Sequence, residues 1–314
     1  MQAANDDQAA HEAYILLLLS DANLPTGSFV ASAGLESYIK HGFFSASAQP
    51  EGASLFDNSS SGSLESDPTS FKDMPNPPRL TSATIRFLQD SVQSYARSAL
   101  PFVGGVHDIV EKVLSSPEDL DNLQEIMQLD TLYESMTLNH VARRASKAQG
   151  VALLTLYTKG FSEPLWIPRS RSPLSKAMTS LIEGLKLKIR KGDTPGHLPI
   201  CWAVLAAALG LTRERSQHLH SFLHARALLS ASVRLNTVGP YAAQQLLLHV
   251  VQPMVENAVR VSKDLQIRFG QPEVSREGDL ELAADEDDGP ANTWPLGEIL
   301  SSRHDQQHSR IFNS

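Results

Sequence analysis

The sequence predicts an all-α protein, formed as a single domain of packed helices with disordered insertions. Leu and Ala, which lose little side-chain entropy in a helix, dominate many segments of the chain. Apolar residues recur at spacings of three and four, which places them on one face of a helix. The period-two alternation typical of a half-buried strand is absent over any useful length. A chain of 314 residues has room for one large domain or two, and the series of helices favours one domain over residues 14–314.

The expected helices follow these periodic segments along the chain. The first covers 82–100, and Pro101 is expected to end it, because proline lacks the N–H that a helix interior needs; a second helix follows. Residues 116–119 read Ser-Pro-Glu-Asp, a helix start with a capping hydroxyl, a first-turn proline and two acids. Thr212 is a suitable N-cap, and Pro253 is expected to kink the helix that contains it. Further helices are expected at about 131–158, 174–191, 198–210, 213–235 and 241–261.

Two polar segments interrupt this pattern. Residues 45–80 are rich in Ser, Pro, Gly and Asp, and residues 271–292 are acidic. Neither can bury enough apolar surface to offset the entropy of ordering its backbone. We therefore predict that 45–80 is a disordered insertion and that 271–292 is an acidic disordered loop.

Charge and composition exclude several classes of protein. The formal net charge of −8 argues against a nucleic-acid backbone as partner. No apolar run reaches the roughly 18 residues that span a bilayer, and the acidic N-terminus does not resemble a secretory signal, so a cytoplasmic protein with no membrane partner is expected. Cys201 is the only cysteine, which rules out an intrachain disulfide; its apolar neighbours indicate a small buried side chain.

The sequence carries no familiar catalytic signature, and an enzyme is not expected. The GxxxxGK[ST] loop, the GxGxxG loop, the GxSxG elbow and the HExxH helix are all absent. The best metal candidate is His218, His220 and His224, since the last two lie four residues apart and share one helix face. Ordinary surface histidines fit the same spacing, so both interpretations stay open. His197, at a helix start, is expected only to order its loop.

The stretch from Leu16 to Glu36 is the strongest candidate for function. Its turn at Leu24-Pro25-Thr26-Gly27 combines a proline that fixes φ with a glycine that permits unusual backbone angles. The small residues 31–34, which end in Gly34, allow another backbone or a partner to approach closely. From the residues alone, a tight corner between two helices is the other interpretation.

This stretch, which reads LLLLSDANLPTGSFVASAGLE, closely resembles the N-terminal signature of the UreF family of urease accessory proteins. Four further blocks resemble the family in the right order, and the match covers the chain from about residue 14 to 314 apart from the two polar segments. Ser28 stands where the family usually has glycine, and Ala31 stands where histidine is common, which removes one possible metal ligand. The four blocks are ASKAQG at 145–150, GHLP at 196–199 with LGL at 209–211, a block from Ala231 to Leu247 that includes Arg234, and the terminal SRIFNS at 309–314.

The resemblance implies a dimeric helical adaptor that helps to load nickel into apo-urease and holds no cofactor of its own. Such an adaptor bridges a second accessory protein, UreD (also called UreH), and the nickel-carrying GTPase UreG. Glu36 is implied to face the GTPase, and the chain end is implied to order against UreD/UreH. The alternative is a direct nickel-binding metallochaperone that uses the three histidines. The implied partner-binding residues are Leu24, Pro25, Gly27, Gly34, Glu36, Arg234, Arg310, Ile311 and Phe312.

Overall fold

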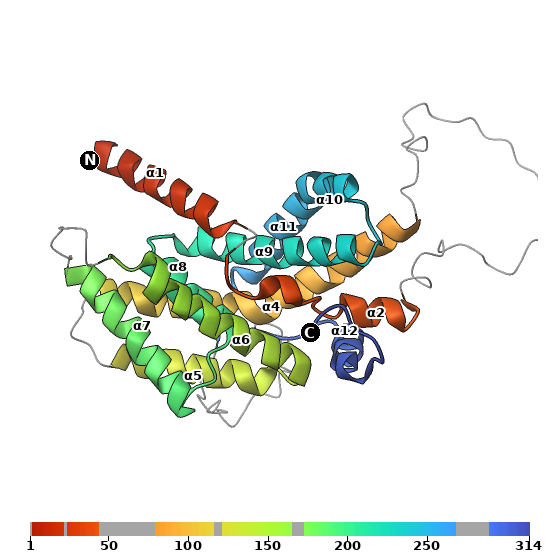
Figure 1. The fold of residues 1–314 in the computed structure, drawn as a ribbon. Coiled ribbons are helices and arrows are strands. Elements are labelled where there is room, and N and C mark those ends of the chain that lie inside the picture. Colours follow the sequence, from red (N-terminus) through yellow and green to blue (C-terminus); the bar gives the residue numbers. More distant parts are fainter. Residues whose placement is uncertain (1, 22–23, 44–78, 116–120, 165–172, 268–288) are drawn as a thin grey trace, which may run out of the picture.

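The computed structural model describes residues 2–21, 24–43, 79–115, 121–164, 173–267 and 289–314 (Figure 1). All regular structure in these ranges is helical and none of it is a strand, which confirms the predicted all-α class. The α-helices are α1 (Gln2–Leu19), α2 (Leu35–Lys40), α4 (Arg79–Ser115), α5 (Asp121–Met136), α6 (His140–Leu156), α7 (Pro173–Lys191), α8 (Leu198–Ala208), α9 (Arg213–Arg234), α10 (Pro240–Leu246), α11 (Gln252–Ser262) and α12 (Pro295–Ser302). The shorter turns are the 3-10 helices Ser28–Val30 and His304–Gln306 and the π-helical turns Tyr157–Phe161 and Leu247–Val251.

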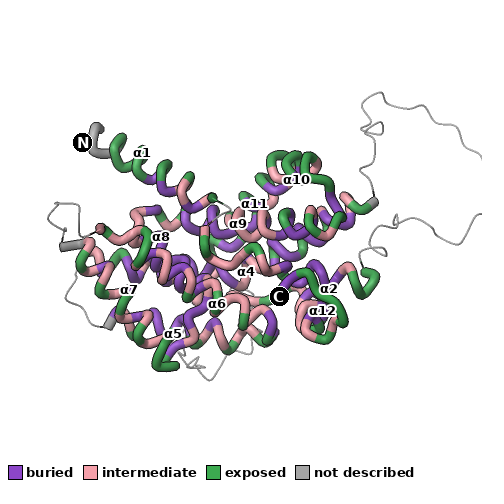
Figure 2. The backbone as a smooth tube through the Cα atoms, viewed as in Figure 1, coloured by how far each residue is buried: buried purple, intermediate pink, exposed green. Residues whose placement is uncertain are grey.

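Helix α4 is the centre of the fold and contacts α5, α8, α9 and α11. Figure 2 shows that buried residues gather where these helices meet. Helix α8 is buried along nearly its whole length, because its sequence is apolar on every side. Cys201 lies within α8, and its complete burial confirms the predicted role of a small core residue.

Pro101 does not end a helix, contrary to the prediction, because α4 continues through it from Arg79 to Ser115. Proline in a helix interior costs about 3 kcal/mol. The residues on either side, Leu100 and Phe102, are completely buried in the core that α4 forms with α8 and α9. Gln217 of α9 also donates a hydrogen bond to the Leu100 carbonyl (3.0 Å). Burial of the flanking residues therefore outweighs the local cost of the proline.

The single helix predicted over 131–158 is in fact two helices, α5 and α6, separated at residues 137–139. Asn139 caps α6: its side-chain oxygen accepts hydrogen bonds from the N–H groups of Val141 (3.0 Å) and Ala142 (3.3 Å). Asparagine is among the best N-cap residues for this reason. The apolar spacing runs on across the break and conceals this signal in the sequence.

The helix predicted over 241–261 is present as α10, a π-helical turn and α11 in direct succession, and its departure from α-helical geometry lies just before Pro253, where a kink was predicted. The π-helical turn Leu247–Val251 joins α10 to α11 just before the proline, which cannot donate the usual helical hydrogen bond.

Thr212 occupies the predicted N-cap position of α9, but its side chain does not cap the helix. Instead, its hydroxyl and its N–H both donate to Glu12 of α1, each at 2.8 Å, which ties α1 to the start of α9.

Most of the predicted disordered segments, and the helix start at 116–119, lie outside the described residues. The segment boundaries need correction, because Arg79 and Leu80 belong to α4. At the other boundary, Asn292 accepts hydrogen bonds from Ser94 of α4 (3.1 Å) and from the N–H of Trp294 (2.8 Å). Among the described residues, none of the helices has the length and apolar character needed to cross a bilayer.

Candidate functional site: a clasp between Glu36 and the chain end

Two glycines shape the segment between α1 and α2. Gly27 (φ 74°) opens the 3-10 turn Ser28–Val30, and Gly34 (φ 86°) precedes α2, so both adopt the left-handed conformation that glycine favours. Gly34 also lies against Ser301 of α12, whose Cβ would be 3.0 Å from a Cβ added at the glycine. The predicted turn and the predicted close approach are both present, and they place α2 directly beside α12.

Glu36, in the first turn of α2, is 0% exposed. Its carboxylate accepts hydrogen bonds from the backbone N–H groups of Ile311 (2.8 Å) and Phe312 (3.1 Å), and from Lys40 Nζ (2.9 Å). Oε2 also lies 3.3 Å from His304 Nε2. Burial by itself raises the pKa of a carboxyl, but these donors, Lys40 first, outweigh it and hold the pKa of Glu36 below its usual value. The ionised carboxylate therefore anchors the chain end.

The last two residues continue along the segment that precedes α2. The N–H of Asn313 donates to the Val30 carbonyl (2.8 Å). The Ser314 carbonyl accepts from the N–H (2.5 Å) and the hydroxyl (3.0 Å) of Ser32. We use the name tail clasp for Val30, Ser32 and Glu36 together with residues 311–314, which they hold.

Two further side chains support the tail clasp. The guanidinium of Arg234, on α9, lies 4.3 Å from the centre of the Phe312 ring and donates to a backbone carbonyl of the 3-10 turn. Asp305 binds Arg310 (2.9 Å) and both terminal nitrogens of Arg144 on α6 (2.8 and 2.9 Å). Hydrogen bonding and charge from Arg144, with charge from Arg310, hold the pKa of Asp305 far below its usual value. The chain end is therefore bonded to α2, α6 and α9 at once.

The predicted partner-binding residues differ in how far they are exposed to solvent. Glu36 was expected to face the GTPase, but in this conformation the tail covers it completely. Phe312 also points inwards with 2% exposed, whereas Ile311 is 63% exposed. Of the rest, Pro25, Arg234 and Arg310 are exposed, Leu24 and Gly27 are half-buried, and Gly34 is buried.

Sequence reasoning does not find four residues that complete this arrangement. The contact of Lys40 with Glu36 could have been predicted, because residues four positions apart on a helix are neighbours. No sequence pattern predicts the contacts of His304, Asp305 and Arg144, since these contacts join segments that are far apart in the chain.

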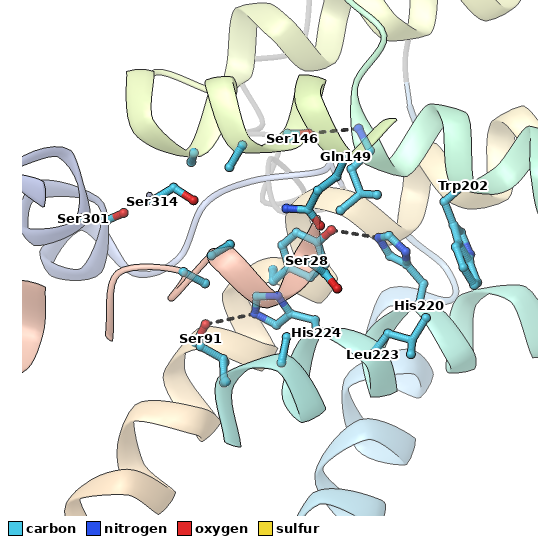
Figure 3. Close-up of a pocket in the computed structure, with 18 of the residues that line it drawn as sticks. Ser28, Ser91, Ser146, Gln149, Trp202, His220, Leu223, His224, Ser301 and Ser314 are labelled. Atoms are coloured by element: carbon cyan, nitrogen blue, oxygen red, sulfur yellow. Dashed lines mark hydrogen bonds between the residues drawn. The ribbon is translucent and has the colours of Figure 1, made fainter. Parts of the chain in front are cut away.

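A cavity of about 360 Å³ adjoins the tail clasp, between α4, α6 and α9 (Figure 3). Arg234 and Ser314 line it, so the cavity and the tail clasp share a wall. Ser146 and Gln149, from the 145–150 block, line it from α6. The N-terminal, the 145–150, the 231–247 and the C-terminal blocks of the resemblance therefore meet around one space.

His220 and His224 reach this cavity from one face of α9, as their spacing predicts (Figure 3). His220 Nε2 lies 2.8 Å from the Tyr95 hydroxyl, and His224 Nε2 lies 3.1 Å from Ser91 Oγ. The Tyr95 ring stacks on His224 with centroids 4.1 Å apart. Burial lowers the pKa of His220 to about 3 and that of His224 to about 4. Both rings are therefore neutral at neutral pH.

The three histidines do not converge on one point. His218 is exposed, and its ligand atoms do not cluster with those of His220 and His224 within the described residues. The two inner rings are each engaged by a hydroxyl of α4. The arrangement fits polar cavity residues better than a three-histidine metal site.

His197 orders the loop before α8, as predicted. Its ring is buried, with Nε2 2.5 Å from Glu134 Oε2 and Nδ1 3.1 Å from Ser146 Oγ. The carboxylate of Asp130 accepts from the N–H groups of Gly196 (2.6 Å) and His197 (2.9 Å). These contacts join α5 and α6 to the start of α8.

Comparison with known proteins gives a consistent result. A sequence model of the UreF family matches residues 81–251. Urease accessory protein 6 of Cryptococcus neoformans var. grubii is 38% identical over 344 aligned residues, covering 99% of this chain and 100% of that protein. An uncharacterized UreF-like urease accessory protein of Schizosaccharomyces pombe is 25% identical, with 96% of this chain and 97% of that protein covered. Urease accessory protein F of Arabidopsis thaliana is 25% identical over 94% of this chain and 90% of that protein.

Proposed function

Because this chain belongs to the UreF family of urease accessory proteins, we propose that it is a non-catalytic adaptor in urease maturation. In this role it bridges a UreD/UreH-like protein and a UreG-like GTPase, and the assembly delivers nickel to apo-urease. A role in urease maturation follows from the family. That the chain bridges two partners is our proposal, and the tail clasp is the observation that supports it.

The tail clasp joins the first and last blocks of the chain into one surface. The N–H of Asn313 bonds to Val30, which follows Phe29, so the exposed side chains of Phe29 and Ile311 project from adjoining segments. Arg310, which is bound to Asp305, adds a positive charge beside them. Two exposed apolar side chains with an arginine nearby are typical of the centre of a protein–protein contact. We assign this surface to the UreD/UreH-like partner.

The partner surface is tested by changing the side chain of Ile311, which is exposed; the residue contributes to the tail clasp through its backbone N–H. Ile311→Asp is expected to lower affinity for the UreD/UreH-like protein at least tenfold in a pull-down or a surface-binding assay, because it places an unpaired charge in an apolar contact. The matched control is Leu187→Asp, an exposed apolar residue of α7. Equal affinity of Ile311→Asp and the unaltered protein would contradict the assignment.

Glu36 contributes to the GTPase-binding surface indirectly in this proposal. Its own side chain is covered, so it acts by holding α2 and the tail in one conformation. Glu36→Gln should weaken recruitment of the GTPase to the assembled complex, because the neutral amide holds the tail less tightly. Unchanged recruitment by Glu36→Gln would remove Glu36 from the GTPase-binding machinery.

We also propose that the adaptor works as a homodimer in the cytoplasm, with nickel as its cargo. Tyr241 of α10 and Leu248 in the following π-helical turn are exposed apolar side chains that a second copy could cover. Light scattering of the purified chain, with Tyr241→Asp as the variant, checks this. A monomer at every concentration would contradict the dimer.

A further inference from the structure

We propose that His107, Asp108 and Glu111 on α4 bind a divalent transition-metal ion. None of the three lines the cavity, and none belongs to the tail clasp. This inference is independent of the bridging function, and it departs from the expectation that the chain holds no metal of its own.

The spacing of the ligand atoms matches that of a metal site. His107 and Glu111 are four residues apart and share one face of α4. His107 Nδ1 lies 3.3 Å from Glu111 Oε1. Two ligands with metal bonds of about 2.1 Å at a tetrahedral angle are roughly 3.4 Å apart, so this pair needs almost no rearrangement. One oxygen of Asp108 completes a group whose ligand atoms all lie within 4.8 Å of one another.

His107 supplies the independent indication of a ligand. Its side chain is 1% exposed, and Nε2 lies 2.8 Å from the Leu211 carbonyl, which can only accept a proton. Nε2 therefore carries a hydrogen, which leaves Nδ1 as the ring nitrogen that can bind a metal ion. Although it is buried, Nδ1 makes no hydrogen bond within the part of the chain that the structure describes. A histidine that donates one N–H to a carbonyl and directs its other nitrogen at a carboxylate has the orientation of a metal ligand.

The kinds of ligand atom at the site suit a transition-metal dication. Asp108 binds Arg213 through Oδ2 (2.8 Å), and that contact holds its side chain beside His107 and Glu111. One imidazole with two carboxylates favours an ion such as Co²⁺, Ni²⁺ or Zn²⁺ over Ca²⁺ or Mg²⁺, which prefer oxygen ligands alone.

Titration of the purified, chelator-treated full chain with Co²⁺ tests the proposal, because the visible spectrum of Co²⁺ reports its ligands. We expect one equivalent to bind. Glu111 is 57% exposed, so Glu111→Gln should fold normally and weaken that binding at least ~10-fold. Glu125→Gln, an exposed carboxylate on α5 that pairs with Lys112, is the matched control and should bind as the unaltered chain does.

A second measurement needs no substitution of the buried histidine. Bound Co²⁺ is paramagnetic and should shift the ring signals of His107 in the NMR spectrum while leaving those of exposed His218 in place. If His107 instead forms a proton-bridged ion pair with Glu111, its signals will not respond to Co²⁺. That result, or equal Co²⁺ affinity of Glu111→Gln and Glu125→Gln, overturns the proposal.

Discussion

Glu36 and Phe312 are joined by a hydrogen bond of 3.1 Å from the backbone N–H to Oε2, across 276 positions of the sequence. The same carboxylate accepts the N–H of Ile311 through its other oxygen. A carboxylate that accepts two adjacent backbone N–H groups fixes the direction of the chain as well as its position. The chain end therefore has a defined course over α2, and a surface that includes it is ordered before any partner arrives.

Glu36→Gln is expected to loosen the tail clasp while the helices stay folded. Glutamine keeps the shape but loses the charge that strengthens the bonds to Ile311, Phe312 and Lys40. The expected loss is about 2 kcal/mol, or roughly 30-fold faster hydrogen exchange at the Ile311 and Phe312 amides. Glu256→Gln, at an exposed position of α11, is the control. Unchanged exchange at both tail amides would show that Glu36 does not hold the tail.

Acidification is expected to open the tail clasp before the helices unfold. The pKa values of Glu36 and Asp305 are both lowered in the folded chain, from the usual 4.5 and 3.8. A lowered pKa means that the stabilisation is complete above the usual value and is lost as the pH falls through the lower, folded value. Tail amide signals in NMR spectra should therefore change below about pH 4. The double variant Glu36→Gln with Asp305→Asn should lack this transition, and its persistence there would assign it to other groups.

The extent of the helices was predictable wherever neighbouring residues decide it. Helix α7 begins at Pro173 and ends at Lys191, close to the expected 174–191, and α9 ends one residue before its predicted end. Pro101, which lies inside α4, is a position that neighbouring residues do not decide. Whether a proline ends a helix depends on what buries its neighbours, and Leu100 and Phe102 are buried by helices about a hundred residues later.

The site was predictable in its parts and not in its arrangement. The N-terminal and C-terminal blocks could be identified separately from their residues. The two blocks bond to each other because α2 packs beside α12, and no local sequence pattern predicts that packing. A glutamate in the first turn of a helix is ordinarily a surface residue, but here His304 and the tail residues that bond to its carboxylate cover Glu36.

His224→Asn is expected to flatten the pH dependence of the melting temperature between about pH 6.5 and pH 4. Burial lowers the pKa of His224 to about 4 in the folded chain, while the unfolded chain takes up a proton near 6.5. Stability due to the neutral ring therefore falls as the pH drops through this window. His218→Asn, at an exposed position six residues earlier on the same helix, is the matched control. Parallel melting profiles for His224→Asn and the unaltered chain would contradict the burial argument.

Three glycine substitutions separate backbone strain from crowding at the start of α2. Gly34→Ala combines a positive φ of 86° with a contact of 3.0 Å to Ser301, whereas Gly192→Ala has a φ of 79° and open space around it. Gly239→Ala, with a φ of −72° and open space, has neither problem. We expect Gly192→Ala to cost about 1 kcal/mol of unfolding free energy, Gly34→Ala clearly more, and Gly239→Ala nothing or a small gain. Chemical denaturation of the three variants measures this order. If Gly34→Ala costs no more than Gly192→Ala, the close approach of α2 to α12 does not constrain this position.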